Sequence, residues 1–253
     1  MRPRVGRSSG AATGTVRTRQ GVILLALAGF ALTAAVPARA AQSTPSSVSR
    51  PDTPVAQDEV TQSAAAKRVA DWVATSGDNR SLPYAIIDKQ DASLVLFDAE
   101  GKLLGKVPVL IGVATGDDAT PGIGSKNLAE IGPAEKTTPA GRFLAKFGLA
   151  AGRQKVLWVD YATSVALHPI PPGASKKERR RERMLSPTPD DNRITFGCIN
   201  VPIAFYGKIL AALFRKKGGY VYVLPDTRPL EDVFPLLHVQ AALNGTGGEK
   251  GSE

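Results

Sequence analysis

The chain has 253 residues and a formal net charge of +9, from 32 lysines and arginines against 23 acidic residues. Six of the arginines lie within residues 1–40, and without them the charge falls from +9 to +3. Nucleic-acid binding needs a basic face spread over the folded domain, so this distribution argues against a nucleic-acid partner.

Residues 1–40 have the three parts of a secretory signal peptide. Residues 2–19 contain five arginines and no acidic residue, residues 21–36 form an apolar run, and Ala38 and Ala40 provide a small-residue cleavage site. The run is shorter than the roughly 20 apolar residues that span a bilayer, which favours cleavage over a membrane anchor. We therefore expect export by the general secretory route to the periplasm or cell envelope, with no stable membrane span after cleavage.

The segment 41–81 is expected to hold a linker and an N-terminal helix. Residues 41–57 are rich in Ser, Pro, Thr and Gln, a composition typical of linkers. Apolar residues then recur at helical spacing over 58–76, and Gly77 is a plausible C-terminal stop. This pattern predicts a small helix packed on the outside of the main domain.

Residues 82–226 have the pattern of short strands separated by turns. Apolar and β-branched runs alternate with turn residues, and 116–139 is irregular and rich in Gly and Pro. This spacing predicts a mainly β domain of the sandwich or partly open barrel type, with small flanking helices. The expected strands are 84–87, 93–97, 102–113, 142–147, 155–161, 164–167 and 220–224.

One helix is predicted near the end of this domain. Pro202 suits its first turn, and Gly218 and Gly219 are expected to stop it. After the last strand, residues 227–253 are expected to form a C-terminal helix and, from Asn244, a disordered tail. The residues that recur at helical spacing are Ile203, Tyr206, Ile209, Leu210, Leu213 and Phe214.

The chain has one cysteine, Cys198, and two histidines, His168 and His238. A single cysteine in an exported protein cannot form an internal disulfide, so it is either a buried inert residue or a nucleophile. His168 ends a predicted strand, and Cys198 joins an extended segment to the helix that begins near Pro202. On their own, one Cys and one His leave the structural and the catalytic interpretation about equally open.

The surroundings of Cys198 suit a nucleophile if the fold brings His168 close. A nearby imidazolium and a helix N-terminus both favour the thiolate, and both are expected here. Gly197 leaves room for a substrate carbonyl to approach the backbone, where the N–H groups of Gly197 and Cys198 could form an oxyanion hole.

Three blocks of the sequence, within roughly 82–226, resemble the L,D-transpeptidase (YkuD-type) catalytic domain. The strand–turn–strand opening at 86–97, continuing through Gly112, looks like that family's N-terminal hairpin. Lys136-Thr-Thr-Pro-Ala-Gly-Arg-Phe143 is similar to its T-P-x-G-x-F segment. Leu167-His168 with Thr195-Phe-Gly-Cys-Ile-Asn200 is similar to its His…[Ser/Thr]-His-Gly-Cys-x-Asn/Arg signature, and this block is the most specific.

The resemblance implies an L,D-transpeptidase-like fold, with Cys198 as nucleophile and His168 as general base. Cys198 would form an acyl-enzyme with a peptidoglycan stem peptide, release D-alanine and transfer the acyl group to an amine of another stem in cell-wall cross-linking. A carbapenem would acylate the same cysteine, and the family needs no cofactor and no metal. The candidate substrate-binding residues are Thr195, Phe196, Asn200 and Arg193, the last through a substrate carboxylate.

The sequence departs from the family pattern in two ways. Phe196 replaces the motif histidine before Gly197, which suggests aromatic packing beside the nucleophile in place of an imidazole. In addition, 26 residues separate His168 from Thr195, more than is usual, and the excess lies at 171–191. A capping box predicts a short helix over 175–184 in this insertion. Its basic run, 176–183, is interpreted as a solvated face, with a lid over the acidic substrate as the alternative.

Two other functions remain open at this stage. A hydrolase on the same scaffold would cut D-alanine, a cross-link or a protein attached to peptidoglycan, and the sequence does not reveal the acceptor. A catalytically silent peptidoglycan-binding module is a different class of protein, and Phe196 is its main support. The presence of both Cys198 and a suitably placed His168 favours an enzyme.

Overall fold

The computed structural model describes residues 61–174 and 176–238. The expected signal peptide, the linker at 41–57, the start of the first predicted helix and the tail from Asn244 lie outside these residues. Within the described ranges, no helix has the length and apolar character needed to cross a bilayer.

Helix α1 (Ala64–Ser76) is the predicted N-terminal helix, but residues 61–63, which the prediction included, are not helical because Ser63 is its N-cap. The Ser63 hydroxyl accepts a hydrogen bond from the Ala66 N–H at 3.0 Å, so a side chain caps the first turn. Gly77 ends the helix in the left-handed conformation, as its position in the sequence predicts. The apolar face carries Val69 and Trp72 against the main sheet, which confirms that the helix packs on the outside of the β domain.

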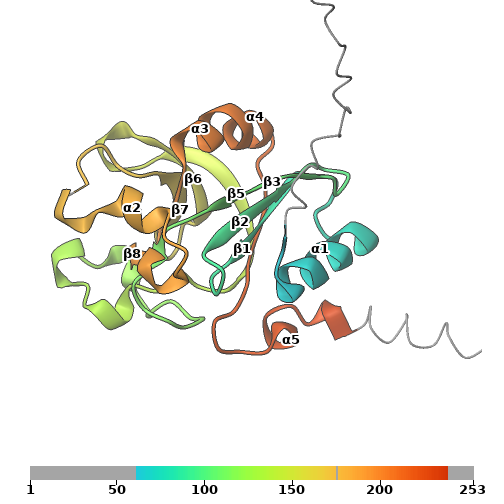
Figure 1. Cartoon of the computed structure of the whole chain (residues 1–253), viewed down its shortest axis with the longest axis horizontal. Helices are drawn as coiled ribbons and strands as arrows, with labels where there is room; N and C mark the ends of the chain where they lie inside the picture. Colours follow the sequence, from blue (N-terminus) through green and yellow to red (C-terminus); the bar gives the residue numbers. More distant parts are fainter. Residues whose placement is uncertain (1–60, 175, 239–253) are drawn as a thin grey trace, which may run out of the picture. The chain divides into compact units, whose positions relative to one another are not determined.

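The domain is mainly β, as predicted, and eight strands form one mixed sheet in the order β3-β2-β1-β10-β5-β6-β7-β9 (Figure 1). Strands β4 and β8 form a separate parallel pair. The strands are β1 (Tyr84–Asp88), β2 (Ser93–Phe97), β3 (Leu103–Pro108), β4 (Ile111–Gly112), β5 (Gly141–Leu149), β6 (Lys155–Asp160), β7 (Val165–Pro169), β8 (Arg193–Thr195), β9 (Ile199–Val201) and β10 (Gly219–Val223).

The sheet curls until its two ends nearly meet, which fits the barrel alternative of the sequence prediction. Leu110, just after β3, and Asn200, in β9, form an antiparallel bridge. The Leu110 N–H donates to the Asn200 carbonyl at 3.0 Å, and the Asn200 N–H donates to the Leu110 carbonyl at 2.9 Å. Strand β9 was not predicted, because three residues between the cysteine and the helix are too few to show a period.

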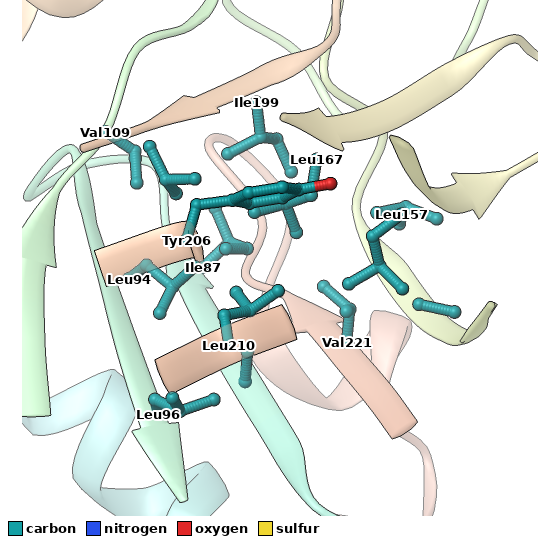
Figure 2. Close-up of a cluster of buried hydrophobic side chains, with 14 of the residues drawn as sticks. Ile87, Leu94, Leu96, Val109, Leu157, Leu167, Ile199, Tyr206, Leu210 and Val221 are labelled. Carbon is teal, nitrogen blue, oxygen red and sulfur yellow. The ribbon is translucent and has the colours of Figure 1, made fainter. Parts of the chain in front are cut away.

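Apolar side chains fill both faces of the central strands. The inner cluster lies inside the curled sheet, where Figure 2 shows the ring of Tyr206 among aliphatic side chains. The outer cluster lies under α1, where Trp72 packs edge-on against Tyr222 with ring centroids 6.0 Å apart. Strands β1, β2 and β10 are therefore buried along their whole length. The labelled members of the inner cluster are Ile87, Leu94, Leu96, Val109, Leu157, Leu167, Ile199, Tyr206, Leu210 and Val221.

The helix after β9 is present but is not a regular α-helix. It consists of α3 (Ile203–Phe205), a π-helical turn at Tyr206–Leu210 and α4 (Ala211–Phe214). The extra residue in the π turn changes the phase, so Phe205 is buried while Ile203 is 76% exposed. The predicted apolar stripe was therefore wrong at Ile203 and also at Ile209, which is exposed.

Short helices complete the described chain. The insertion contains η5 (Lys176–Glu178) and α2 (Arg180–Met184), which are separated by Arg179 at a φ of +49°. The single helix predicted over 175–184 was therefore wrong, because a left-handed residue divides it. The others are η1 (Ile123–Ser125), η2 (Leu128–Glu130), η3 (Pro133–Glu135), η4 (Ala151–Arg153), η6 (Pro189–Asn192) and α5 (Leu230–Val233).

Candidate active site

The parallel pairing of β7 with β9 brings the two candidate catalytic residues onto one face of the sheet. Leu167 pairs with Ile199 and His168 pairs with Asn200. Side chains alternate along a strand, and Leu167 and Ile199 point into the inner cluster. His168 therefore points to the opposite face, and the same alternation carried one residue back from β9 puts Cys198 on that face as well.

Cys198 is a half-buried thiol directly before β9. Its Sγ lies 3.6 Å from the Ser164 carbonyl, which it faces as a weak donor. Burial raises the pKa of the Cys198 thiol, while the Ala166 N–H and the charge of Arg180 act in the opposite direction. The neutral thiol is therefore the resting form at pH 7.

The expected contribution of a helix N-terminus to this thiol was wrong. Strand β9 occupies Ile199–Val201, so the helix begins at Ile203, beyond the strand that follows Cys198. The field of a helix terminus falls off within its first turn, so the helix supplies little stabilisation to a thiolate at Cys198.

His168 is held in one tautomer by its own strand. Its Nδ1 lies 2.7 Å from the Pro169 carbonyl oxygen, which can only accept, so Nδ1 carries the proton and Nε2 is left as the basic nitrogen. Burial lowers the pKa of His168, the hydrogen bond to Pro169 raises it, and Arg180 lowers it. The imidazole is thus neutral at pH 7, which suits a general base rather than a preformed imidazolium–thiolate pair.

The turn before Cys198 is fixed by two threonines. The Thr195 hydroxyl donates to the Cys198 carbonyl at 2.6 Å and accepts from the Gly197 N–H at 3.1 Å. The Thr138 hydroxyl donates to the Gly197 carbonyl at 2.9 Å. Because Thr195 is 2% exposed and already bonded on both sides, the structure gives it a place in the turn rather than at the substrate. The Gly197 N–H is likewise directed into the turn.

Phe196 lies beside the nucleophile with 40% of its surface exposed. The ammonium of Lys136 is 3.8 Å from the centroid of its ring, a cation–π contact that joins the loop 116–139 to the cysteine turn. This position is open to solvent and suits contact with a ligand. The ring cannot donate or accept a hydrogen bond as an imidazole would.

Asn200 connects this face to the insertion. Its side chain is fully buried, its Oδ1 accepts from Arg180 Nη1 at 3.0 Å, and its Nδ2 is 3.5 Å from His168 Nδ1. Since Nδ1 donates to Pro169, this last contact is a close approach of two donors. Arg180 was missed by the sequence analysis, because nothing in the run 176–183 distinguishes it from its basic neighbours.

The side chain of Arg193 is engaged in a buried ion network and not with Cys198 or His168. Its guanidinium pairs with Asp226 at 2.7 Å, where the two side chains are 13% and 2% exposed. Asp226 also pairs with Lys89 at 3.2 Å, and Lys89 pairs with Asp117 at 3.0 Å. Lys89 further donates to the Thr138 carbonyl at 3.0 Å, so this buried ion network supports the turn that carries Cys198.

A cleft lies away from the candidate site. Its volume is about 530 Å³, and Cys198 and His168 do not line it. It is lined by the turn between β1 and β2, by the end of β3 and by the loop of Ser186 and Pro187. The part of the chain that the structure describes contains no group of three or more His, Cys, Asp or Glu side chains arranged to hold a metal ion.

No protein-family model and no curated protein sequence matches the chain. Among solved structures, it is similar to the catalytic domain of the Enterococcus faecium L,D-transpeptidase, with 17% identity over 56% of this chain and 96% of that one, at a TM-score of 0.32. The Xylanimonas cellulosilytica L,D-transpeptidase gives 14% identity over 56% and 60% of the two chains, at a TM-score of 0.34. The helical cell shape determining protein Pgp2 of Campylobacter jejuni gives 14% identity over 70% and 63%, at a TM-score of 0.40.

The chain spans less than two thirds of the length of the second and third of these proteins. At such identities and TM-scores, neither activity nor residue roles carry over from them to this chain.

Proposed function

We propose that the protein is an exported cysteine acyltransferase of the L,D-transpeptidase type that acts on peptidoglycan stem peptides. The observation that supports the proposal is the parallel pairing of β7 with β9, which sets His168 beside Asn200, two residues after Cys198, while Pro169 fixes the His168 tautomer. A nucleophile beside a base that is itself oriented by a third group is the arrangement required for covalent catalysis.

The protonation states favour attack by general base catalysis. Neutral His168 takes the thiol proton at Nε2 while Cys198 Sγ attacks the carbonyl before the terminal D-alanine of the stem. The tetrahedral intermediate collapses to a thioester, and the departing amine of D-alanine receives the proton from His168. A side-chain amine of a second stem then attacks the thioester, which forms the cross-link and restores the thiol.

The proposal assigns the oxyanion contact to the Cys198 N–H. The sequence analysis assigned this role to the N–H groups of Gly197 and Cys198 together, but the Gly197 N–H is bonded to Thr195 Oγ1. Phe196 and Lys136 border the same turn, and we assign them to substrate contact, with the ammonium of Lys136 available to a stem-peptide carboxylate.

The deciding test is incubation of the purified protein with a disaccharide-tetrapeptide, followed by mass spectrometry. We expect a cross-linked dimer with loss of D-alanine, no product from Cys198→Ala, and a strongly reduced rate from His168→Ala. Tripeptide without dimer would replace the transpeptidase with the hydrolase alternative. No conversion, together with thermal stabilisation by the fragment, would support the silent peptidoglycan-binding module.

Acylation by a carbapenem gives an independent test of the nucleophile. We expect the intact protein to gain the mass of one carbapenem, and Cys198→Ala to gain none. A folded wild-type protein that stays unmodified after long incubation would contradict the proposal.

A further inference from the structure

The insertion 171–191 delivers one guanidinium to the face that carries Cys198 and His168. Arg180 begins α2, and its side chain is only 13% exposed. The neighbouring Arg179, which precedes α2, is 71% exposed and pairs with Glu182. The basic run therefore has two parts, a solvated face as expected and one arginine that is turned inward.

The inward position of Arg180 is fixed from both sides. Its Nε donates to Glu178 at 2.9 Å, and its Nη1 donates to Asn200 Oδ1 at 3.0 Å. Asn200 is itself immobilised, because its backbone N–H and carbonyl both bond to Leu110. A guanidinium held by two planar acceptors keeps its orientation, so its charge stays beside the strand pair that carries the thiol and the imidazole.

Arg180 is the charged side chain whose electrostatic effect reaches both the His168 imidazole and the Cys198 thiol. Lys136, from the loop 116–139, lies over the Phe196 ring, and Asp160, at the end of β6, bonds to Thr163. Glu178 is paired with Arg180 itself. The charge of Arg180 lowers the pKa of His168 and also that of Cys198. Both effects favour loss of a proton from the pair.

We propose that Arg180 is a positioning residue of the active site, which fixes Asn200 beside His168 and holds its own guanidinium next to the strand pair that carries the catalytic face. This role rests on the proposed function, since it presupposes that the pair is catalytic. The insertion then acts as a fixed strap across the site, rather than as a lid that closes over the substrate.

The direction of the effect follows from the charge. Removal of a nearby cation raises the pH at which the Cys198 thiol loses its proton. Alkylation of Cys198 by iodoacetamide reports this pH, because the thiolate is the reactive form and the reagent is uncharged. No knowledge of the natural substrate is needed.

We would measure the alkylation rate from pH 5 to 10 in the wild-type protein, Arg180→Gln and Arg180→Lys. In Arg180→Gln, the curve is expected to move to higher pH, with a rate about three- to tenfold lower on its acidic side. Arg180→Lys keeps the charge but loses the bidentate geometry, so it should recover most of this displacement. Circular dichroism and thermal unfolding would show that each variant is folded.

Arg181→Gln is the matched control. Arg181 lies next to Arg180 on α2 and is exposed, so the substitution removes the same charge from the same helix. Its alkylation curve should stay within about twofold of the wild-type curve, because a solvated charge is screened.

The outcomes separate this inference from the proposed function. If alkylation of the wild type is His168-dependent but Arg180→Gln reproduces the wild-type curve, the role of Arg180 is overturned and the catalytic pair stands. An equal displacement of the curve in Arg181→Gln would also overturn the role of Arg180, because any lost positive charge on α2 would then have the same effect. If wild-type alkylation is slow and unchanged by His168→Ala, the catalytic pair itself is contradicted.

Discussion

At Gly197, both the backbone conformation and the surrounding atoms exclude a residue with a side chain. Its φ is +120°, outside the range that L-residues adopt, and a Cβ would lie 2.6 Å from the Thr137 carbonyl oxygen. The clash is with backbone, which cannot turn aside as a flexible side chain can. A glycine is therefore required next to the nucleophile for reasons of conformation and of space.

Gly197→Ala should lower the free energy of unfolding by about 3 kcal/mol and slow the alkylation of Cys198. Urea denaturation and thiol kinetics would measure the two effects. Gly122→Ala is the control, because Gly122 also has a positive φ, +76°, but has open space around a Cβ. That variant should lose only about 1 kcal/mol. Equal losses in the two variants would show that the contact with Thr137 has no effect.

The residues of the candidate site were partly predictable from the sequence. Cys198 and His168 were found because each is one of very few residues of its kind. The different positions of Arg193 and Arg180 could not be predicted. The sequence does not show that Arg193 pairs with Asp226 while Arg180 bonds to Asn200. Arginine side chains are long, and their partners depend on tertiary contacts that no local pattern encodes.

At the scale of elements, the buried ion network joins segments far apart in the chain. Asp117 accepts hydrogen bonds from the N–H groups of Asp226, Thr227 and Arg228, and it also pairs with Lys89. Burial alone would raise the pKa of Asp117, but these hydrogen bonds outweigh it and hold the pKa well below its usual value. The loop after β10 is thereby tied to the start of the loop 116–139.

This depressed pKa predicts an acid limit to stability. A carboxylate with a lowered folded pKa stabilises the protein fully above its unfolded pKa of about 4, and this stabilisation is lost as the pH falls below it. Asp117→Asn should lower the free energy of unfolding by about 3 kcal/mol at pH 7 and flatten its dependence between about pH 4 and 2.

The exposed neighbour Asp118, which is 80% exposed, provides the control for this network. Asp118→Asn should change the free energy of unfolding by less than about 1 kcal/mol and leave its acid dependence as in the wild type. Denaturation curves at several pH values would compare the variants. An acid dependence in Asp117→Asn that equals that of the wild type would contradict the assignment.

The elements that the sequence predicted well are those with several residues of clear period. Strands β1, β2, β6 and β10 agree with their predicted ranges to within a residue or two at each end. Strand β9 and the break at Arg179 were missed, because three residues cannot show a period and a left-handed arginine has no sequence signature. The π turn was missed for a similar reason, since one added residue changes the phase without changing the composition.

At the scale of the whole molecule, the bridge between Leu110 and Asn200 nearly closes the sheet. Both residues are fully buried, and each donates its N–H to the other. We predict that these two amides exchange hydrogen as slowly as those of Val221 and Val223 in the central β10, because all four require global unfolding. The amides of α2 should exchange faster, because most of that helix is open to solvent.

Hydrogen exchange followed by mass spectrometry would measure these rates. Peptides that cover 199–201 and 219–223 should gain deuterium together, while 180–184 gains it earlier. Early exchange at 199–201 with a protected β10 would show that β9 opens by itself, and that the sheet is closed less firmly than the bridge implies.

The position of Asn200 also affects when the site can form as the chain folds. Strands β2, β5 and β6 pair with their neighbours in the chain, but the pairings of β1 with β10, of β10 with β5 and of β7 with β9 join distant parts of the sequence. These distant pairings form later than the hairpins, because the entropy of loop closure opposes them. The residue that closes the sheet through its backbone also carries the side chain beside His168. Activity should therefore appear only with the last step of folding, so that an incompletely folded chain carries an unactivated thiol.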